Sequence, residues 1–388
     1  MIKPSEISNS IQTSYTRQLF NLAKDYNDVI DFTLGDPDVQ THQAIKDAAC
    51  RAIQDGKTRY SQNAGLLELR QTIHDYYLRK EGLNYNPENE IQVSVGAMEG
   101  LYLVFLALLN PGDEVIIPAP YYVNYTQMVP MCHGVPVIVD NPDVNDLSFR
   151  IQDVEDAISP KTKAIMLNTP CNPTGKIIPQ ETLMGVAELA IKHNLVVIAD
   201  EVYKCLVYDK REWKSIASFD GMRERTIIIN SLSKEFCMTG YRIGYVLGPS
   251  EIIAAMTKLQ ENVAACAPLP SQYAAIEALS GKEDYSKDMV RTFTERKNCI
   301  ASGIRAIPGL ACYEPEATFY LMVDISSTGL KSLDFALELL KSQHVAVVPG
   351  LTYGKSCDNY VRIAFTKNVE EIHEGVRRIG EFMKGIMK

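Results

Sequence analysis

Short apolar runs separated by longer amphipathic segments form the main pattern of the 388-residue chain. Several runs are apolar throughout, which is typical of strands that are buried on both faces. These runs are residues 91–95, 114–118, 135–139, 164–168, 195–200, 226–230 and 244–248. Amphipathic stretches such as 98–109 and 181–194 lie between most of them and predict helices. The alternation predicts an α/β fold with a mostly parallel sheet covered on both faces.

The pattern changes after about residue 280, where a long polar helical stretch leads to shorter strands and a final helix. The expected strands are residues 319–325 and 360–365. This pattern of helices and short strands predicts a second, smaller α+β domain. We expect a large domain at 44–285 and a small domain composed of 1–43, as an N-terminal arm, and 286–388, as its α+β part.

Composition narrows the possible partners and locations. The net charge of −9 argues against nucleic acid or an anionic membrane as a main partner, since either favours a basic surface. We find no signal-peptide segment and no window near the ~18 apolar residues that a spanning helix needs. The nine cysteines include no CxxC pair, which favours reduced thiols in the cytoplasm. The six histidines lack ligand spacing, so no metal site is predicted.

Polar or conformationally special residues follow four of the predicted strands. Asp200 closes one run and Asn168 closes another, while Gly96 follows a third and Ser231 a fourth. The carboxyl ends of parallel strands meet at one edge of a sheet, where ligands bind in such folds. We therefore expect the chemistry of this chain at that edge.

The chemistry available there is specific. A buried Asp200 needs a cationic partner, and a protonated pyridine nitrogen would serve. Tyr203 and Asn172 could hydrogen-bond a phenolic oxygen. The helix start after Gly96, with nearby serines and an arginine, could hold a phosphate. Lys234, whose amine pKa burial would lower, could form an imine with an aldehyde. Together these groups describe a site for pyridoxal phosphate.

Each signal alone also has a plain structural explanation. An aspartate at a strand end is often a helix cap, and the segment 172–175, NPTG, makes a good turn. Lys234 alone could be a surface lysine, and Arg242 alone an ion-pair partner. Their joint occurrence in order, each near a strand's carboxyl end, favours the cofactor site.

Three motifs make the chain resemble the class I/II pyridoxal-phosphate-dependent aminotransferases of the aspartate aminotransferase fold. They are S-x-S-K-x5-G-x-R-x-G at 231–244, N-x-P-x-N-P-T-G at 168–175 and D-E-x-Y at 200–203. The resemblance implies the fold-type-I architecture, with a large cofactor-binding α/β/α domain and a smaller α+β domain. It also implies a transaminase of amino-acid metabolism, which moves an amino group between an L-amino acid and a 2-oxo acid.

The resemblance further implies a role for each matching residue. Lys234 would form the Schiff base and shuttle the proton, and Asp200 would hold the ring nitrogen protonated. Tyr203 and Asn172 would bind the ring oxygen, so Lys234, Asp200 and Tyr203 form the implied catalytic set. Tyr122 would stack on the ring. The implied phosphate ligands are Ala97, Met98, Ser231, Ser233 and Arg242.

Substrate and partner roles follow from the same resemblance. Arg362 would clamp the substrate α-carboxylate, with Asn172 and the backbone of Gly35 beside it. A planar guanidinium suits bidentate carboxylate binding. Tyr60 matches a tyrosine that reaches the phosphate in the neighbouring subunit, which implies a homodimer with shared sites.

The donor stays open, because it could be aromatic, neutral or acidic. Some family members that prefer dicarboxylic substrates carry a lysine where this chain has Met98, and a methionine cannot pair with a carboxylate. Aspartate as donor would then need another arginine or lysine. Met98, Tyr15 and the segment 262–270 are compatible with an aromatic or neutral donor.

Three other functions stay open beside transamination. The nearest is a same-fold carbon–sulfur β-lyase, although a histidine commonly replaces Tyr203 in those enzymes. A cyclopropane-forming synthase would need a sulfonium substrate. A ligand-sensing regulator on this fold would carry an N-terminal DNA-binding domain, and we expect none because the fold begins by about residue 30.

Overall fold

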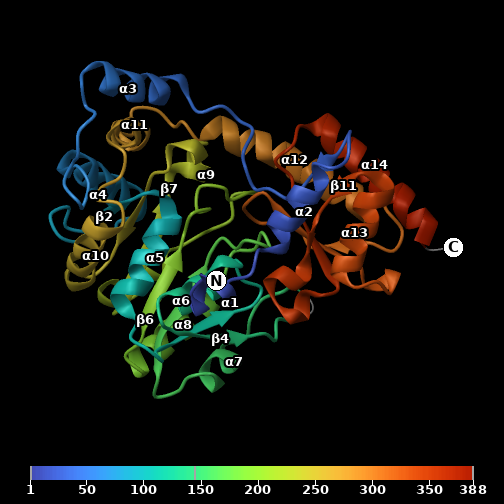
Figure 1. Ribbon diagram of the computed structural model, residues 1–388, viewed down its shortest axis with the longest axis horizontal. Coiled ribbons are helices and arrows are strands. Elements are labelled where there is room, and N and C mark those ends of the chain that lie inside the picture. Colours follow the sequence, from blue (N-terminus) through green and yellow to red (C-terminus); the bar gives the residue numbers. More distant parts are fainter. Residues whose placement is uncertain (1, 144–145, 387–388) are drawn as a thin grey trace.

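The structure is a computed structural model that describes residues 2–143 and 146–386. Its larger sheet has the strand order β2-β8-β7-β6-β5-β3-β4 (Figure 1). All pairings from β7 through to β4 are parallel, whereas β8 runs antiparallel to both β2 and β7. The strands are β2 (Ile91–Ser94), β3 (Glu114–Pro118), β4 (Val135–Val139), β5 (Thr162–Asn168), β6 (Val196–Asp200), β7 (Thr226–Ser231) and β8 (Gly244–Leu247). The predicted, mostly parallel sheet is confirmed.

Helices cover both faces of this sheet, which explains why its strands are apolar throughout. Alternate residues of β7 point to opposite faces. Ile227 and Ile229 pack in one apolar cluster with α5 and α10, and Ile228 packs in another with α4 and α11. The helices around the sheet are α3 (Gln43–Gln54), α4 (Leu67–Glu81), α5 (Gly96–Leu108), α6 (Asn124–Met131), α7 (Ile151–Asp156), α8 (Gln180–Lys192), α9 (Leu232–Glu235), α10 (Ser250–Val263) and α11 (Leu269–Leu279).

A second, antiparallel sheet lies in the C-terminal part, in the order β12-β13-β10-β9. Its strands are β9 (Ala311–Cys312), β10 (Tyr320–Asp324), β12 (Val348–Pro349) and β13 (Tyr360–Ala364). The helices packed with it are α12 (Lys287–Arg305), α13 (Ser332–Gln343) and α14 (Val369–Ile386). The expected α+β character of this part is confirmed, and Figure 1 shows it as the orange and red half of the molecule.

The last part of the N-terminal segment joins this smaller part, whereas the Gln12 amide contacts the large part and donates to Gln127 Oε1 at 3.3 Å. It contains α1 (Glu6–Ser10), α2 (Tyr15–Ala23) and β1 (Ile30–Asp31), and β1 pairs in parallel with β11 (Val345–Ala346). The arrangement suits an N-terminal arm of the small domain. The boundaries at 44 and 285 remain a prediction, and residues 1 and 387–388 lie outside the described part.

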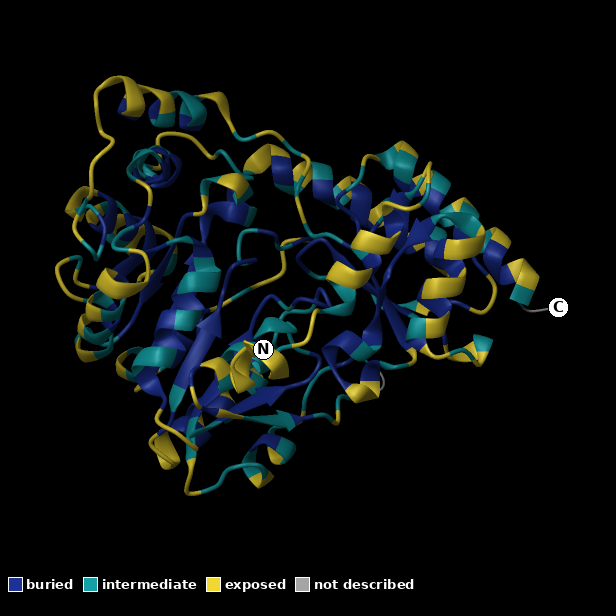
Figure 2. Cartoon of the chain, in the orientation of Figure 1, coloured by how far each residue is buried: buried dark blue, intermediate teal, exposed yellow. Residues whose placement is uncertain are grey.

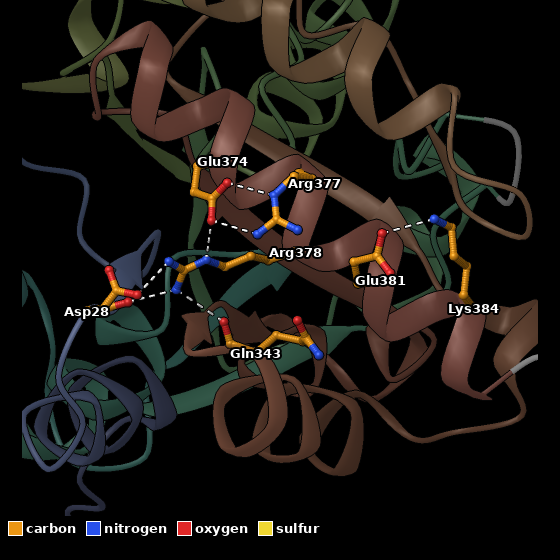
Figure 3. Close-up of polar contacts among 7 residues, drawn as sticks. All are labelled: Asp28, Gln343, Glu374, Arg377, Arg378, Glu381 and Lys384. Carbon is orange, nitrogen blue, oxygen red and sulfur yellow. Dashed lines mark hydrogen bonds and ion pairs between the residues drawn. The ribbon is translucent and has the colours of Figure 1, made fainter.

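Charged contacts from α14 hold this segment in place (Figure 3). Arg378 Nη2 lies 2.7 Å from Asp28 Oδ2, and Arg378 Nη1 donates to the Asp28 carbonyl at 2.7 Å. On its own helix, Arg378 Nε donates to Glu374 Oε1 at 2.7 Å. One arginine thus connects α14 to the chain that leads into β1.

Burial follows the two sheets, whose central strands are dark blue in Figure 2, while the edge strand β4 is mostly teal and the outer helix faces are exposed. Among the described residues, no helix is both long enough and apolar enough to cross a membrane.

Candidate active site

A cavity of about 430 Å³ lies where the two sheets face each other. Asn168, Asp200 and Ser231, the last residues of β5, β6 and β7, line it from the large sheet. Tyr320 and Arg362 line it from the smaller one. The predicted site residues that line the cavity are Gly35, Ala97, Met98, Tyr122, Asn172, Asp200, Tyr203, Ser231, Ser233, Lys234, Arg242 and Arg362. The predicted convergence at the carboxyl ends of the strands is therefore present.

Lys234 enters the cavity from α9, the single helical turn that follows β7. Ser231 begins this turn, because its Oγ accepts a hydrogen bond from the Ser233 amide at 3.1 Å. Lys234 Nζ donates to the Gly35 carbonyl at 2.6 Å. Burial lowers the pKa of Lys234 to about 8, against the Asp36 carboxylate, which raises it, and with the positive charge of Arg242, which lowers it further. A substantial share of this amine is therefore unprotonated near neutral pH, as a nucleophile or base requires.

Asp200 closes β6 and is only 6% exposed. Burial raises the pKa of Asp200 to about 6, against hydrogen bonds from Tyr125 and from the Val202 amide. The Tyr125 hydroxyl donates to Oδ2 at 2.6 Å, and Val202 N donates to Oδ1 at 3.2 Å. Because burial disfavours the ionised form of this carboxyl group, a cation bound beside it would stabilise the carboxylate.

An anion site is built where α5 begins. Gly96 opens this helix with φ of +76°, and a Cβ there would lie 2.5 Å from Arg242 Nη2. Glycine is therefore required for the arginine to approach the helix start. No described side chain caps α5, so the first-turn amides of Ala97 and Met98 lack such a partner. Free amides, the helix dipole and a guanidinium together suit a phosphate.

Arg362 lies in the middle of β13 and is 4% exposed. Its Nη1 donates to Asn172 Oδ1 at 3.1 Å, and its Nη2 donates to the Thr33 carbonyl. The guanidinium carbon lies 4.4 Å from the ring centroid of Tyr320 and 5.3 Å from that of Tyr353. Within the described residues, the buried Nε has no hydrogen-bond partner. A bound carboxylate would satisfy such a donor.

Comparison with known proteins decides the family. The family model for aminotransferase class I and II matches residues 27–379. The chain belongs to this family.

Similar proteins span nearly the same length as this aminotransferase. The aspartate aminotransferase of Bacillus sp. (strain YM-2) is 40% identical over 92% of both chains. The aromatic aminotransferase of Pyrococcus horikoshii OT3 has a solved structure with a TM-score of 0.90 and 36% identity, covering 95% of this chain and 99% of that one. The Thermus thermophilus aspartate aminotransferase with maleate has a TM-score of 0.93 and 33% identity, covering 98% and 100%.

The enzyme is therefore a pyridoxal-phosphate-dependent aminotransferase, which acts between an amino acid and a 2-oxo acid. The residues of the cavity fit this cofactor. They supply a buried carboxylate with a raised pKa, an amine with a lowered pKa and an anion site at a helix start. The predicted family, fold and cofactor are confirmed, and transamination is the supported choice over the carbon–sulfur lyase.

Tyrosines complete the wall of the aminotransferase cavity. Tyr203 and Tyr320 place their hydroxyl oxygens 3.0 Å apart. A Cβ at Gly35 would lie 1.9 Å from the Tyr320 hydroxyl, so only glycine allows this backbone approach. The Tyr122 hydroxyl donates weakly to Met98 Sδ at 3.7 Å.

Sequence reasoning missed Tyr125, Tyr320 and Arg17, although Tyr320 and Arg17 line the cavity and Tyr125 contacts Asp200. The position of Tyr125, three residues after Tyr122 at a helix start, is a signal that could have found it. Tyr320 is hidden within an apolar strand. Neither Tyr15 nor any residue of 262–270 lines the cavity of the described chain.

Tyr60 differs from every other predicted site residue. Its side chain is 87% exposed and does not line the cavity of its own chain. A role in this cavity would therefore require a second subunit.

Proposed function

We propose that Lys234 binds the cofactor covalently and moves the proton on which transamination depends. The observation that supports this role most strongly is its position: a buried amine with a pKa of about 8 in the same cavity as Asp200 and Arg362. An amine whose pKa is lowered in this way has an appreciable unprotonated fraction near neutral pH, so that it serves as a nucleophile first and as a base later.

When bound, pyridoxal phosphate supplies an aldehyde and a ring that accommodates negative charge from the substrate α-carbon. Arg362 binds the α-carboxylate and so orients the α C–H bond toward Lys234. Lys234 Nζ would take up the α-proton of the substrate and return it to the carbon that carried the cofactor's aldehyde. The Asp200 carboxylate would hold the ring nitrogen of the bound cofactor in its protonated form.

The remaining predicted residues hold the cofactor in place. Tyr203 and Asn172 would bind the ring oxygen, and Tyr122 would pack on the ring. The Asn172 Oδ1 contact with Arg362 also connects the ring oxygen to the carboxylate site, beside Gly35. The proposed phosphate ligands are Ala97, Met98, Ser231, Ser233 and Arg242.

A half-reaction tests this function directly. The yellow absorbance of the cofactor-loaded enzyme should bleach when an amino donor is added and return when a 2-oxo acid follows. Lys234→Ala should retain cofactor but show neither change. Pyruvate and ammonia released from cystathionine without any 2-oxo acid would contradict transamination and indicate a β-lyase.

We further propose a cytoplasmic homodimer in which Tyr60 of each subunit reaches the phosphate of the other. The exposed ring of Tyr60 and nine unpaired cysteines are consistent with this. Mixing inactive Lys234→Ala subunits with Tyr60→Ala subunits should regenerate one unaltered site per mixed dimer and restore cofactor affinity there. Mixtures that never exceed the average of the two parents would contradict shared sites.

A further inference from the structure

The Tyr60 side chain is open to solvent, but the loop that follows it is held by buried groups. Residues 61–66 form this loop and connect Tyr60 to the start of α4. Side chains from β2, α4, α11 and the segment before α11 bind its polar groups, and none of them lines the cavity of the described chain. An exposed aromatic ring on a loop fixed in this way is pre-organised for a partner.

Gln272, on α11, binds both ends of this loop and is fully buried, with 0% exposure. Its Oε1 accepts from the Leu66 amide at 2.7 Å, and its Nε2 donates to Ser61 Oγ at 3.0 Å. Nε2 also donates to the Ala267 carbonyl at 2.8 Å. Both polar atoms of the amide are therefore used, and the loop cannot shift relative to α11 without breaking buried hydrogen bonds.

The segment 262–270 holds the residue that directly follows Tyr60. The Ser61 amide donates to Cys266 Sγ at 3.4 Å. Ala265 has a φ of +61°, a conformation that a residue other than glycine adopts at an energetic cost and keeps only where its surroundings determine it. Ser61 is thus fixed through both its amide and its hydroxyl.

Arg70 and Gln92 hold the middle of the loop. Arg70 is 4% exposed, and it donates to Gln62 Oε1 at 2.8 Å through Nη2 and to the Gly65 carbonyl at 3.3 Å through Nε. Gln92 Nε2 donates to the Asn63 carbonyl at 2.9 Å. Because Gln92 belongs to β2, the loop is fixed to the strand that leads into α5 and its anion site.

We propose that Gln272 is a positioning residue, which holds Ser61 so that Tyr60 presents its hydroxyl to the phosphate bound in the neighbouring subunit. This inference rests on the proposed function, in which Tyr60 reaches that phosphate. Gln272 acts through the loop 61–66 rather than by touching the cofactor. Its loss therefore weakens the hold on the phosphate and leaves the contacts of the pyridine ring intact.

The test compares Gln272→Leu, Tyr60→Phe and the double variant in the full-length enzyme, freed of cofactor and titrated with pyridoxal phosphate or with pyridoxal, which lacks the phosphate. Tyr60→Phe should weaken pyridoxal phosphate about 10-fold, since a hydrogen bond to a charged group is lost. Gln272→Leu should weaken it about 5-fold, and neither variant should change the affinity for pyridoxal. The double variant should bind pyridoxal phosphate no more weakly than Tyr60→Phe, because Gln272 acts through that hydroxyl.

Ser61→Ala is a milder second variant that leaves the α11 amide in place and carries the test if Gln272→Leu does not fold. It should weaken pyridoxal phosphate about 3-fold and leave pyridoxal unchanged, because the acceptor for Gln272 Nε2 is lost. Gln71→Leu is the matched control, since Gln71 is exposed on α4 and bonds Asp75 of its own helix at 3.2 Å. This control should match the wild type.

Three results would overturn the role of Gln272. They are wild-type affinity for pyridoxal phosphate in Ser61→Ala and Gln272→Leu, equal losses for pyridoxal phosphate and pyridoxal, and a Gln272→Leu loss that adds in full to that of Tyr60→Phe. Wild-type affinity for pyridoxal phosphate in Tyr60→Phe alone would instead overturn the proposed reach of Tyr60 into the neighbouring subunit.

Discussion

Two neighbouring regions of this aminotransferase are built from the same three stretches of chain. They differ in whether their charged side chains are paired inside the protein. Asp200, Tyr203 and Lys234 line the cavity. The residues that directly follow them, Glu201, Lys204 and Glu235, belong instead to a buried charge cluster, which we define as these three together with Glu81. The cluster residues contribute nothing to the cavity lining.

The buried charge cluster finds its partners inside the protein. Lys204 Nζ forms an ion pair with Glu81 Oε1 and lies 3.7 Å from the centroid of the Tyr77 ring. The Tyr76 hydroxyl donates to Glu235 Oε1 at 2.8 Å. Burial raises the pKa of both Glu201 and Glu235, whereas Lys204 lowers it. Burial alone would lower the pKa of Lys204, yet Glu81 and its neighbours raise it overall.

Within the described residues, neither Asp200 nor Lys234 forms an ion pair, although the Asp36 carboxylate in the same cavity raises the pKa of Lys234. Asp200 accepts hydrogen bonds from neutral donors only, and Lys234 donates to a neutral carbonyl. Groups held in this way carry a desolvation cost that a ligand can relieve. The comparison shows that burial alone does not identify the functional side of these strands. A buried charge without an ion-pair partner does.

The largest expected effect is a loss of turnover when Lys234 of the cavity is replaced. Lys234→Ala should reduce turnover by at least about 10⁴-fold, because both the covalent attachment and the proton transfer are lost. The circular dichroism spectrum and the melting temperature should stay close to those of the wild type. A variant that retains turnover would contradict the role of Lys234.

The next effect falls on stability. Lys204→Met should lower the free energy of unfolding by about 3–5 kcal/mol at pH 7, since it leaves the Glu81 carboxylate buried without its cation. Urea unfolding of the apoenzyme measures this. The double variant Lys204→Met/Glu81→Gln serves as the control and should recover part of the loss. Equal stability of the single and double variants would show that the ion pair is not what Lys204 contributes.

The pH dependence of the apoenzyme probes Asp200. Its pKa rises from 3.8 to about 6 on folding, so the folded state holds a proton that the unfolded state has lost between these values. Stability contributed by this group is therefore full below pH 4 and falls by roughly 3 kcal/mol as the pH rises to 6. Asp200→Asn should remove that fall. Parallel pH–stability curves for the variant and the wild type would contradict the raised pKa.

A smaller effect concerns Arg362. Arg362→Lys should lower kcat/KM about 10- to 100-fold for the amino donor and the 2-oxo acid alike, because a lysine cannot form the bidentate contact. An amine donor without an α-carboxylate is the control and should be unaffected. An equal loss for that amine would mean that Arg362 acts on the cavity structure rather than on the carboxylate.

Much of the fold could be predicted from sequence because the strands of the large sheet are apolar on both faces. The predicted runs match β2 to β8 within about two residues at each end. The sequence did not predict that β8 inserts antiparallel between β2 and β7, since apolar content carries no information on strand direction.

The candidate site was predictable where residues occur in ordered motifs at strand ends, as Asp200 and Lys234 do. Arg17 and Tyr320 could not be predicted in this way. They reach the cavity only because the N-terminal segment and the small sheet fold against the large one, and neither position has a local pattern. The buried charge cluster was not predicted. In the sequence its members are charged residues beside the motif residues, and nothing distinguishes them from ordinary surface charges.

Peptide mass mapping after borohydride reduction of the cofactor-loaded enzyme tests the central claim most directly. The reduced cofactor should be found on the peptide that contains Lys234, and the peptide that contains Lys204 should be unmodified although it lies one residue from Tyr203. A Lys234 peptide without the cofactor mass, or a label on another lysine, would contradict the assignment of the cavity as the active site.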